Sequence, residues 1–282
     1  MRSGTQVGLS IDTDTDANAA DNLRVSDAFR RRLPRPTWWQ SIVSVVVGIV
    51  LWQLWVDVFH PNPFAVVSPT QVWDAARNMA EAGTLWTDFW RSLQTFFLGF
   101  ALGFSVGVLV GVIVGASRRV NAFIGPWITI FYSIPIIALA PLFIIWIGFD
   151  MKARVVIVAV ASFFPVVINT RAGVQSVDRG LRDVCTAFRA TRLEAFRYVL
   201  IPGSVPYILA GVRLGLGRGL IALIFADFYG ATAGLGYALN TSQSSAQTAN
   251  VYVIIVILAI MGLSFNGIVT LLERRFSTYR AT

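Results

Sequence analysis

Charged residues are scarce in this sequence, and their scarcity excludes most classes of soluble protein. Only 13% of the 282 residues are Asp, Glu, Lys or Arg, whereas a soluble domain usually carries about a quarter. Hydrophobic residues make up 55% of the chain, and the mean hydropathy is +0.65. This composition excludes a disordered chain and an ordinary soluble enzyme, and it predicts a polytopic membrane protein.

Cysteine and histidine are nearly absent. Cys185 is the single cysteine, so no disulfide can form within the chain. His60 is the single histidine, so no cluster typical of a transition-metal site is present. The sequence also has no phosphate-binding loop of the form GxxxxGKS or GxxxxGKT. We therefore expect no catalytic residue, no metal site and no cofactor bound by this chain.

Six charge-poor segments are long enough to cross a bilayer, which takes about 20 apolar residues. The predicted spans are residues 36–56, 92–117, 120–149, 155–170, 205–229 and 251–272. The sequence therefore predicts an all-α membrane fold with about six transmembrane helices and with both termini on the same side.

Basic residues are distributed unevenly between the segments that join these spans. Seventeen lie in the two termini and in the connections after the second and fourth spans, whereas four lie in the other connections. Because arginine and lysine accumulate on the cytoplasmic side of membrane proteins, we expect both termini in the cytoplasm. The same topology explains the net charge of +8, so no nucleic-acid partner is expected.

The segments outside the spans differ in composition. Residues 1–36 are polar and end in a cluster of arginines, and we expect a disordered cytoplasmic tail before a transmembrane domain of residues 37–282. The inner connection, residues 171–201, is rich in arginine and compatible with helix. It is either a solvated loop that sets the topology or a helical platform for a cytoplasmic partner.

The outer connection, residues 57–88, contains the start and stop signals of a short helix. Ser68 is a suitable N-cap, and Pro69 suits the first helical position. We expect this helix to end near Ala82.

Glycine recurs at every fourth position of the second span. The residues concerned are Gly99, Gly103, Gly107, Gly111 and Gly115. Residues at this spacing lie close to one face of a helix and allow a neighbouring helix to approach closely. The pattern predicts tight packing, in a bundle or in a dimer, and it carries no information about cargo.

The third span contains Pro126, Pro135 and Pro141. Proline inside a span frees backbone carbonyls, and this is tolerated where those groups find other partners. The prolines are either ordinary kinks or the breaks typical of helices that line a transport path. Tyr132, Ser133 and Pro135 are therefore candidate path residues.

Three charged residues, Arg213, Arg218 and Asp227, interrupt the fifth span. Charges within a membrane are costly and usually face the interior of a bundle. Arg213 either lines a path or extends to the inner surface. Asp227 follows Arg218 by nine residues and lies on the opposite face of an unbroken helix, so we expect no ion pair between them. Asp227 is a further candidate path residue.

Several stretches resemble one family of membrane transport proteins. DVCTAFRATRLEAFRYVLIPGSVPYILAGVRLGLG (residues 183–217) resembles the EAA loop of ABC-importer permeases. SIPIIALAPLFIIWIGF, FFPVVINTRAGVQSVD, SPTQVWDA and ADFYGATAGLGYAL are similar to segments of the nitrate, sulfonate and taurine permeases, and the likeness extends from about residue 37 to residue 279. The residues that this resemblance assigns to coupling with an ATPase are Asp183, Cys185, Ala187, Phe188, Arg189, Ala190, Thr191 and Pro202.

The loop departs from the family pattern at several positions. Asp183 replaces the usual Glu, and Val184 and Cys185 replace two alanines. Arg189 replaces the glycine of the turn, which is unfavourable if the backbone there needs a positive φ. Asp227 stands where the family commonly has Glu.

The resemblance implies a subunit of a type I ABC importer in the plasma membrane. Two permease chains, either identical or paralogous, would work by alternating access on a pair of cytoplasmic ATPases that use ATP and Mg²⁺. An extracytoplasmic binding protein would deliver the cargo. Family members carry nitrate, bicarbonate, sulfonates, taurine, thiamine-related pyrimidines or aromatic compounds, and an organic sulfonate is preferred here.

Two other classes remain as alternatives on the residues alone. A secondary transporter or channel predicts an inverted repeat and paired acids within the spans, and the spans contain no clear repeat and one acid, Asp227. A membrane enzyme needs a convergent set of reactive side chains, and the single histidine disfavours it.

Overall fold

The computed structural model describes residues 38–277, and the tail predicted for residues 1–36 lies outside the described residues. Every regular element in the described range is a helix, as the sequence predicts. The chain divides into one unit of residues 1–55 and a second unit of residues 56–282. In the first unit, the described residues belong to α2 (Trp38–Phe59), a 22-residue apolar helix that is long enough to cross a membrane.

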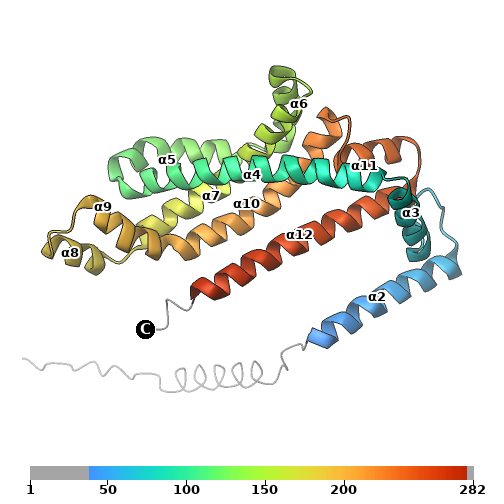
Figure 1. Cartoon of the computed structure of the whole chain (residues 1–282), viewed down its shortest axis with the longest axis horizontal. Helices are drawn as coiled ribbons and strands as arrows, with labels where there is room; N and C mark the ends of the chain where they lie inside the picture. The colour runs from blue at the N-terminus through green and yellow to red at the C-terminus, as the bar shows by residue number, and fades with distance from the viewer. Residues whose placement is uncertain (1–37, 278–282) are drawn as a thin grey trace, which may run out of the picture. The chain divides into compact units, whose positions relative to one another are not determined.

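Four long helices form the body of the second unit. They are α4 (Thr84–Ala116), α7 (Met151–Ser176), α10 (Ile201–Gly230) and α12 (Thr248–Ser277). Helix α7 packs along both α4 and α10, and α12 packs on α10 (Figure 1). A core cluster joins residues of all four helices and of the short helix that follows α10. Its fully buried members include Phe96, Val158, Leu223, Leu235 and Ile254.

The glycines of α4 explain how closely α4 and α7 approach each other. A Cβ placed on Gly99 would lie 2.7 Å from the carbonyl oxygen of Val155, and one on Gly103 would overlap the carbonyl of Ala159. Gly107, Gly111 and Gly115 meet α7 in the same way. The glycine face of α4 is therefore covered by a helix of its own chain.

The short helix α3 (Pro69–Glu81) has the predicted N-cap. The Ser68 hydroxyl accepts a hydrogen bond from the Gln71 backbone N–H at 3.3 Å, and the Gln71 side chain accepts one from the Ser68 N–H at 2.9 Å. This reciprocal pair satisfies two N–H groups that a helix start leaves free. Pro69 occupies the first turn, as predicted.

The segment predicted as the third span is broken into two helices, α5 (Arg118–Ser133) and α6 (Ile136–Ile147), which are bent by 94° relative to each other. Pro135 disfavours the helical conformation at Ile134, whose φ of −76° and ψ of 128° are extended. Pro126 and Pro141, in contrast, lie inside α5 and α6. Counting the bent pair as one span gives up to six spans among the described residues.

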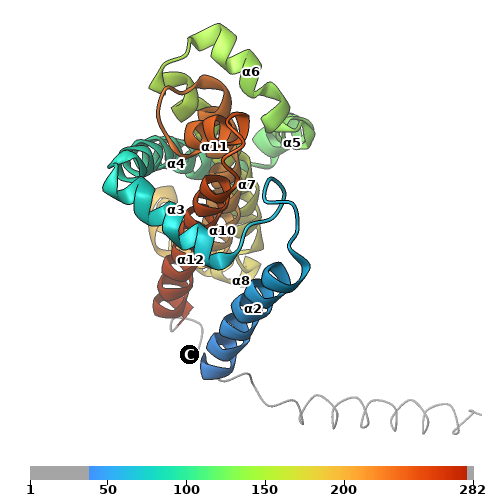
Figure 2. The ribbon, with the colours of Figure 1, turned by 90° about the vertical axis from the view of Figure 1, so that its right-hand side faces the viewer.

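The connections contain helices that are shorter than the spans. The inner connection forms α8 (Arg179–Ala187), α9 (Arg192–Ala195) and a π-helical turn (Phe196–Leu200), and α11 (Leu235–Ser244) follows α10. Figure 2 shows α3 crossing in front of the long helices when the second unit is viewed towards its α3 end. In Figure 1, α3 and α11 lie at one end of the long helices, and α8 and α9 lie at the other.

Candidate transport and coupling sites

A buried ion pair lies at the α11 end of the second unit. Asp227 of α10 is 0% exposed, and its carboxylate accepts a hydrogen bond from the Arg154 guanidinium of α7 at 2.9 Å. The Ser92 hydroxyl of α4 donates to the other carboxylate oxygen, and the Gly236 backbone N–H also donates to Asp227. One acidic side chain therefore ties α4, α7, α10 and the start of α11 together.

Further hydrogen bonds fix the chain reversal between α10 and α11. The Leu235 N–H donates to the Ser92 hydroxyl oxygen at 2.8 Å, and the Gly234 N–H donates to the Asp88 carboxylate at 2.8 Å. Gly234 has a φ of +134°, and a Cβ there would collide with the Asp227 carboxylate. Only glycine suits this turn. The candidate path residue Asp227 is thus enclosed by its own chain.

Sequence reasoning missed Arg154 as the partner of Asp227. The predicted fourth span begins at residue 155, so Arg154 was counted among the charges of the outer connection, whereas α7 begins at Met151. The two partners are 73 residues apart, and no spacing rule connects them. Asp227 thus has Arg154, and not Arg218, as its ion-pair partner.

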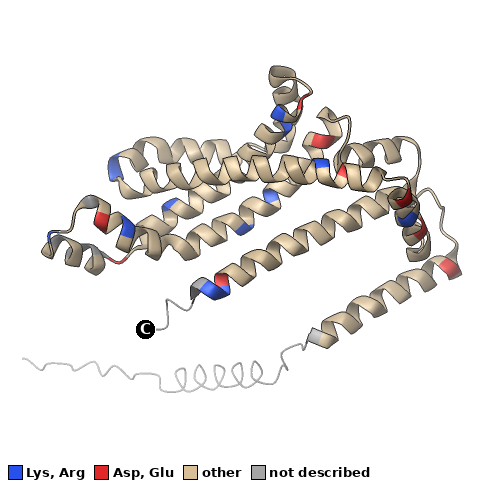
Figure 3. Cartoon of the chain, in the orientation of Figure 1, with Lys and Arg blue, Asp and Glu red and all other residues tan. Residues whose placement is uncertain are grey.

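The two arginines of α10 have different surroundings. Arg213 donates to the carboxylate of Glu273 at 2.7 Å and to the hydroxyl of Thr270 at 3.0 Å, both on α12. The Arg218 guanidinium lies over the ring of Tyr132, with its carbon 4.7 Å from the ring centre. Figure 3 shows that charged residues gather towards the ends of the helices of the second unit, with few along their middle.

The other candidate path residues lie at the break between α5 and α6. Tyr132 belongs to the last turn of α5, and its ring also contacts Phe164 of α7, with 6.4 Å between the ring centres. Ser133 is exposed and donates to the Thr129 carbonyl at 2.9 Å. Pro135 is the residue before α6. Tyr132, Ser133 and Pro135 lie close together because they are close in the sequence, whereas Asp227 lies in a separate cluster.

The turn after α8 keeps a glycine-like backbone although it contains arginine. Arg189 has a φ of +52°, in the left-handed region. The Ala190 N–H donates to the Cys185 carbonyl at 2.8 Å, five residues back, as in the turn that commonly ends a helix at glycine. Arg189 therefore adopts the positive-φ conformation that is unfavourable for a residue other than glycine.

A capping box starts the next helix. The Thr191 hydroxyl accepts from the Glu194 N–H at 3.3 Å, and the Glu194 carboxylate accepts from the Thr191 N–H at 2.7 Å. The sequence signal, Thr followed three residues later by Glu, was available. Asp183 and Cys185 lie within α8, and Pro202 lies in the first turn of α10.

Large apolar side chains are exposed on this inner loop. Leu181, Val184 and Phe188 follow the spacing of one helix face, and Phe188 is 83% exposed. Leu193 of α9 is also exposed. A solvated topogenic loop does not require such side chains, because charged residues suffice for it. The arrangement offers an apolar surface at the α8 end of the bundle.

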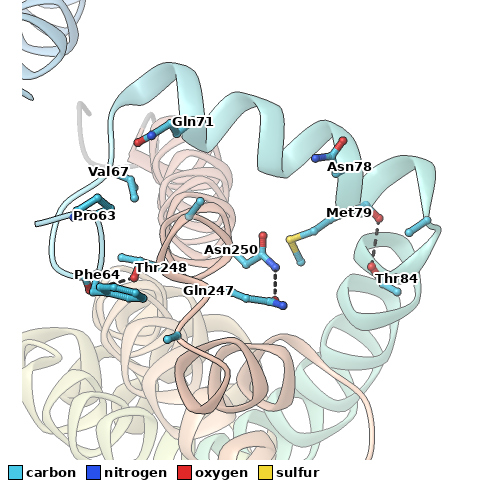
Figure 4. Close-up of a pocket in the computed structure, with 13 residues that line it drawn as sticks. Pro63, Phe64, Val67, Gln71, Asn78, Met79, Thr84, Gln247, Thr248 and Asn250 are labelled. Carbon is cyan, nitrogen blue, oxygen red and sulfur yellow. Dashed lines mark hydrogen bonds between the residues drawn. The ribbon is translucent and has the colours of Figure 1, made fainter. Parts of the chain in front are cut away.

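A pocket of about 610 Å³ lies at the opposite end (Figure 4). Residues of α3, of the loop before it and of the turn between α11 and α12 line it, and none of its described lining residues is charged. Polar groups from both sides face it, and the Asn250 amide donates to the Gln247 side chain at 2.8 Å. On α3 itself, Trp73 is 73% exposed.

These features define a multi-pass membrane transport subunit. The described residues contain no group of three or more His, Cys, Asp or Glu that could hold a metal ion. The family model for inner membrane components of binding-protein-dependent transport systems matches residues 103–278. The chain belongs to this family, and it is an ABC-importer permease of the inner membrane, not an enzyme.

Individual relatives agree with this assignment. The putative aliphatic sulfonates transport permease protein SsuC of Bacillus subtilis is 30% identical over 94% of this chain and 97% of its own length. The protein of the same name from Escherichia coli is 36% identical over 81% of this chain and 87% of its own length. An inward-facing structure of the MetNI methionine ABC transporter has the same fold, with a TM-score of 0.58, 21% identity and coverage of 66% and 93%.

Proposed function

We propose that this permease imports small aliphatic sulfonates. The two relatives described above are named as sulfonate permeases, and both match most of this chain. The test is uptake of radiolabelled ethanesulfonate by cells that lack other sulfonate importers and express the complete importer. Sulfur-limited growth on ethanesulfonate is an independent readout. Uptake that needs the permease supports the proposal, and its absence at every sulfonate chain length tested contradicts it.

The exposed apolar face of α8 is the observation that carries the proposed coupling to an ATPase. Leu181, Val184 and Phe188 would be covered by the ATPase, and burial of such side chains contributes about 1.5–3 kcal/mol each. The turn at Arg189 and the capping box at Thr191 fix the angle between α8 and α9. In this proposal the permease binds no cofactor, and ATP and Mg²⁺ are bound by the ATPase.

The opposite end is the proposed contact for the binding protein. Helix α3 is amphipathic, exposes Trp73 and borders the uncharged pocket of Figure 4. Tryptophan is enriched at sites that dominate protein–protein binding. This assignment places α8 in the cytoplasm and both termini on the cytoplasmic side.

We also propose that two permease chains assemble. The glycine face of α4 is already covered by α7, so the contact between the two chains uses other surfaces. Co-purification of two differently tagged copies tests a homodimer. Recovery of one tag alone, together with a different permease, would identify a paralogous partner.

Two matched substitutions separate the two contact surfaces. Phe188→Ser should abolish co-purification of the ATPase. In any complex that still assembles, stimulation of ATP hydrolysis by the binding protein should be unchanged. Trp73→Ser should leave ATPase co-purification unchanged and reduce stimulation by the binding protein. Both variants should insert in the membrane at wild-type levels, since both side chains are exposed. Normal ATPase association of Phe188→Ser would contradict the coupling proposal.

A further inference from the structure

Arg218 is an exposed arginine close to the middle of α10. The helix has 30 residues, and at 1.5 Å per residue Arg218 lies about 4 Å from its midpoint and about 18 Å from its outer end. The hydrocarbon core of a bilayer is about 30 Å thick, so this position falls inside it. An arginine facing lipid at that depth is costly, and such residues face a bundle interior or a water-filled cavity.

The counter-charge of Arg218 is not supplied by the described chain. Arg213, five residues earlier, has Glu273 as its partner, whereas no described carboxylate lies within ion-pair distance of Arg218. Asp88 and Asp227 are engaged at the outer end of the helices.

The surroundings of Arg218 are open and adjoin the broken span. Gly217 has no atom within 4 Å of the position of an added Cβ, and Leu214 and Ile221 on the same side of α10 are exposed. Tyr132 brings the guanidinium near the end of α5. Helix α6 starts at Ile136, just beyond, and no side chain caps its N-terminus. Free backbone N–H groups and the helix dipole favour an anion near such a terminus.

We propose that Arg218 binds the anionic group of the cargo within the transport path, with Tyr132 holding the guanidinium in place. The proposal rests on the sulfonate import proposed above and names the permease residue that recognises the sulfonate group. A guanidinium offers two parallel N–H donors, which suits the oxygens of an oxyanion. An unpaired cation at membrane depth thereby gains a counter-charge only while cargo passes.

The test compares Arg218→Gln with Arg213→Gln, which makes the same change in charge on the same helix. Ethanesulfonate uptake by the complete importer is measured per assembled complex, with the amount of complex determined by pull-down. Removal of a charged hydrogen-bonding partner should lower the maximal uptake rate of Arg218→Gln by about tenfold or more. The ethanesulfonate concentration that gives half-maximal uptake should stay unchanged, because the binding protein captures the cargo. Arg218→Lys should give an intermediate rate.

The outcomes distinguish this inference from the function on which it rests. Binding-protein-stimulated ATP hydrolysis that persists in Arg218→Gln, together with lost uptake, supports a cargo contact and excludes a folding defect. Wild-type uptake by Arg218→Gln overturns the inference and leaves sulfonate import intact. An equal loss in Arg213→Gln and Arg218→Gln also overturns it, since a general structural need for charge would then explain both. Absence of uptake by the wild-type importer overturns both proposals.

Discussion

The interface between α4 and α7 and the surface of α8 use apolar residues in opposite ways. Between α4 and α7, every fourth residue of α4 is glycine, and side chains of α7 such as Val158 are fully buried against it. Val184 of α8 and Phe188, directly after its last residue, are exposed although they lie in a connection rich in arginine. The first region is completed within the chain. The second is exposed in the described chain, and the proposed contact with an ATPase would cover it.

The largest effect should come from breaking the buried ion pair between Asp227 and Arg154. Asp227→Ala leaves Arg154 buried without its partner, and such a change typically costs about 3–5 kcal/mol. We expect severe loss of folded protein, measured by size-exclusion chromatography in detergent. Glu273→Ala is the control, because it breaks the pair with Arg213, whose two side chains are partly exposed, so the loss of folded protein should be smaller. Equal yields of the two variants would contradict the structural role of Asp227.

The next effect concerns the glycine face of α4. Gly103→Leu should force α4 away from the Ala159 carbonyl, and overpacking of this kind typically costs about 1–3 kcal/mol. A lower detergent melting temperature is the measurement. Gly267→Leu on α12 is the matched control, since nothing lies within 4 Å of a Cβ added there. Equal melting temperatures of the two variants would contradict the close packing of α4 against α7 at Gly103.

Two valines test the contrast between the α4–α7 interface and the exposed surface of α8. Val158→Ala removes fully buried methyl groups and should cost about 1–2 kcal/mol. Val184→Ala changes an exposed residue and should alter stability by less than about 0.5 kcal/mol, but it should weaken ATPase co-purification. Melting curves and pull-downs of the two variants measure both quantities. An ATPase that binds both variants equally would weaken the assignment of α8.

The last effect has the opposite sign and is expected at the turn after α8. Arg189→Gly relieves a left-handed backbone conformation that costs a non-glycine residue about 1–2 kcal/mol, and it should stabilise the loop. Protection of the loop against proteolysis is the measurement. Ala187→Gly, two residues earlier at the last residue of α8, is the control and should lower protection by weakening the end of the helix. Lower protection of Arg189→Gly would mean that the arginine side chain holds the turn.

Local composition and spacing are enough to predict several features of the fold. Runs of apolar residues locate the long helices, because a bilayer requires about 20 of them in succession. Ser68 and Gln71 form the cap of α3 within four residues, and the glycines of α4 mark a close-packing face wherever its neighbour lies. The motifs around Asp183 and Pro202 also indicate the permease class, which the family match shows.

Which residues distant in the sequence come into contact depends on how the helices pack. Pro126, Pro135 and Pro141 look alike in the sequence, yet only Pro135 coincides with a 94° bend between helices. Arg154 and Asp227 are 73 residues apart, and their pairing depends on the packing of α7 against α10. Burial removes water from such charges, so either charge without its partner would strongly destabilise the fold. Among residues 38–277, the same packing leaves Arg218 without a carboxylate within ion-pair distance, a property that no local pattern specifies.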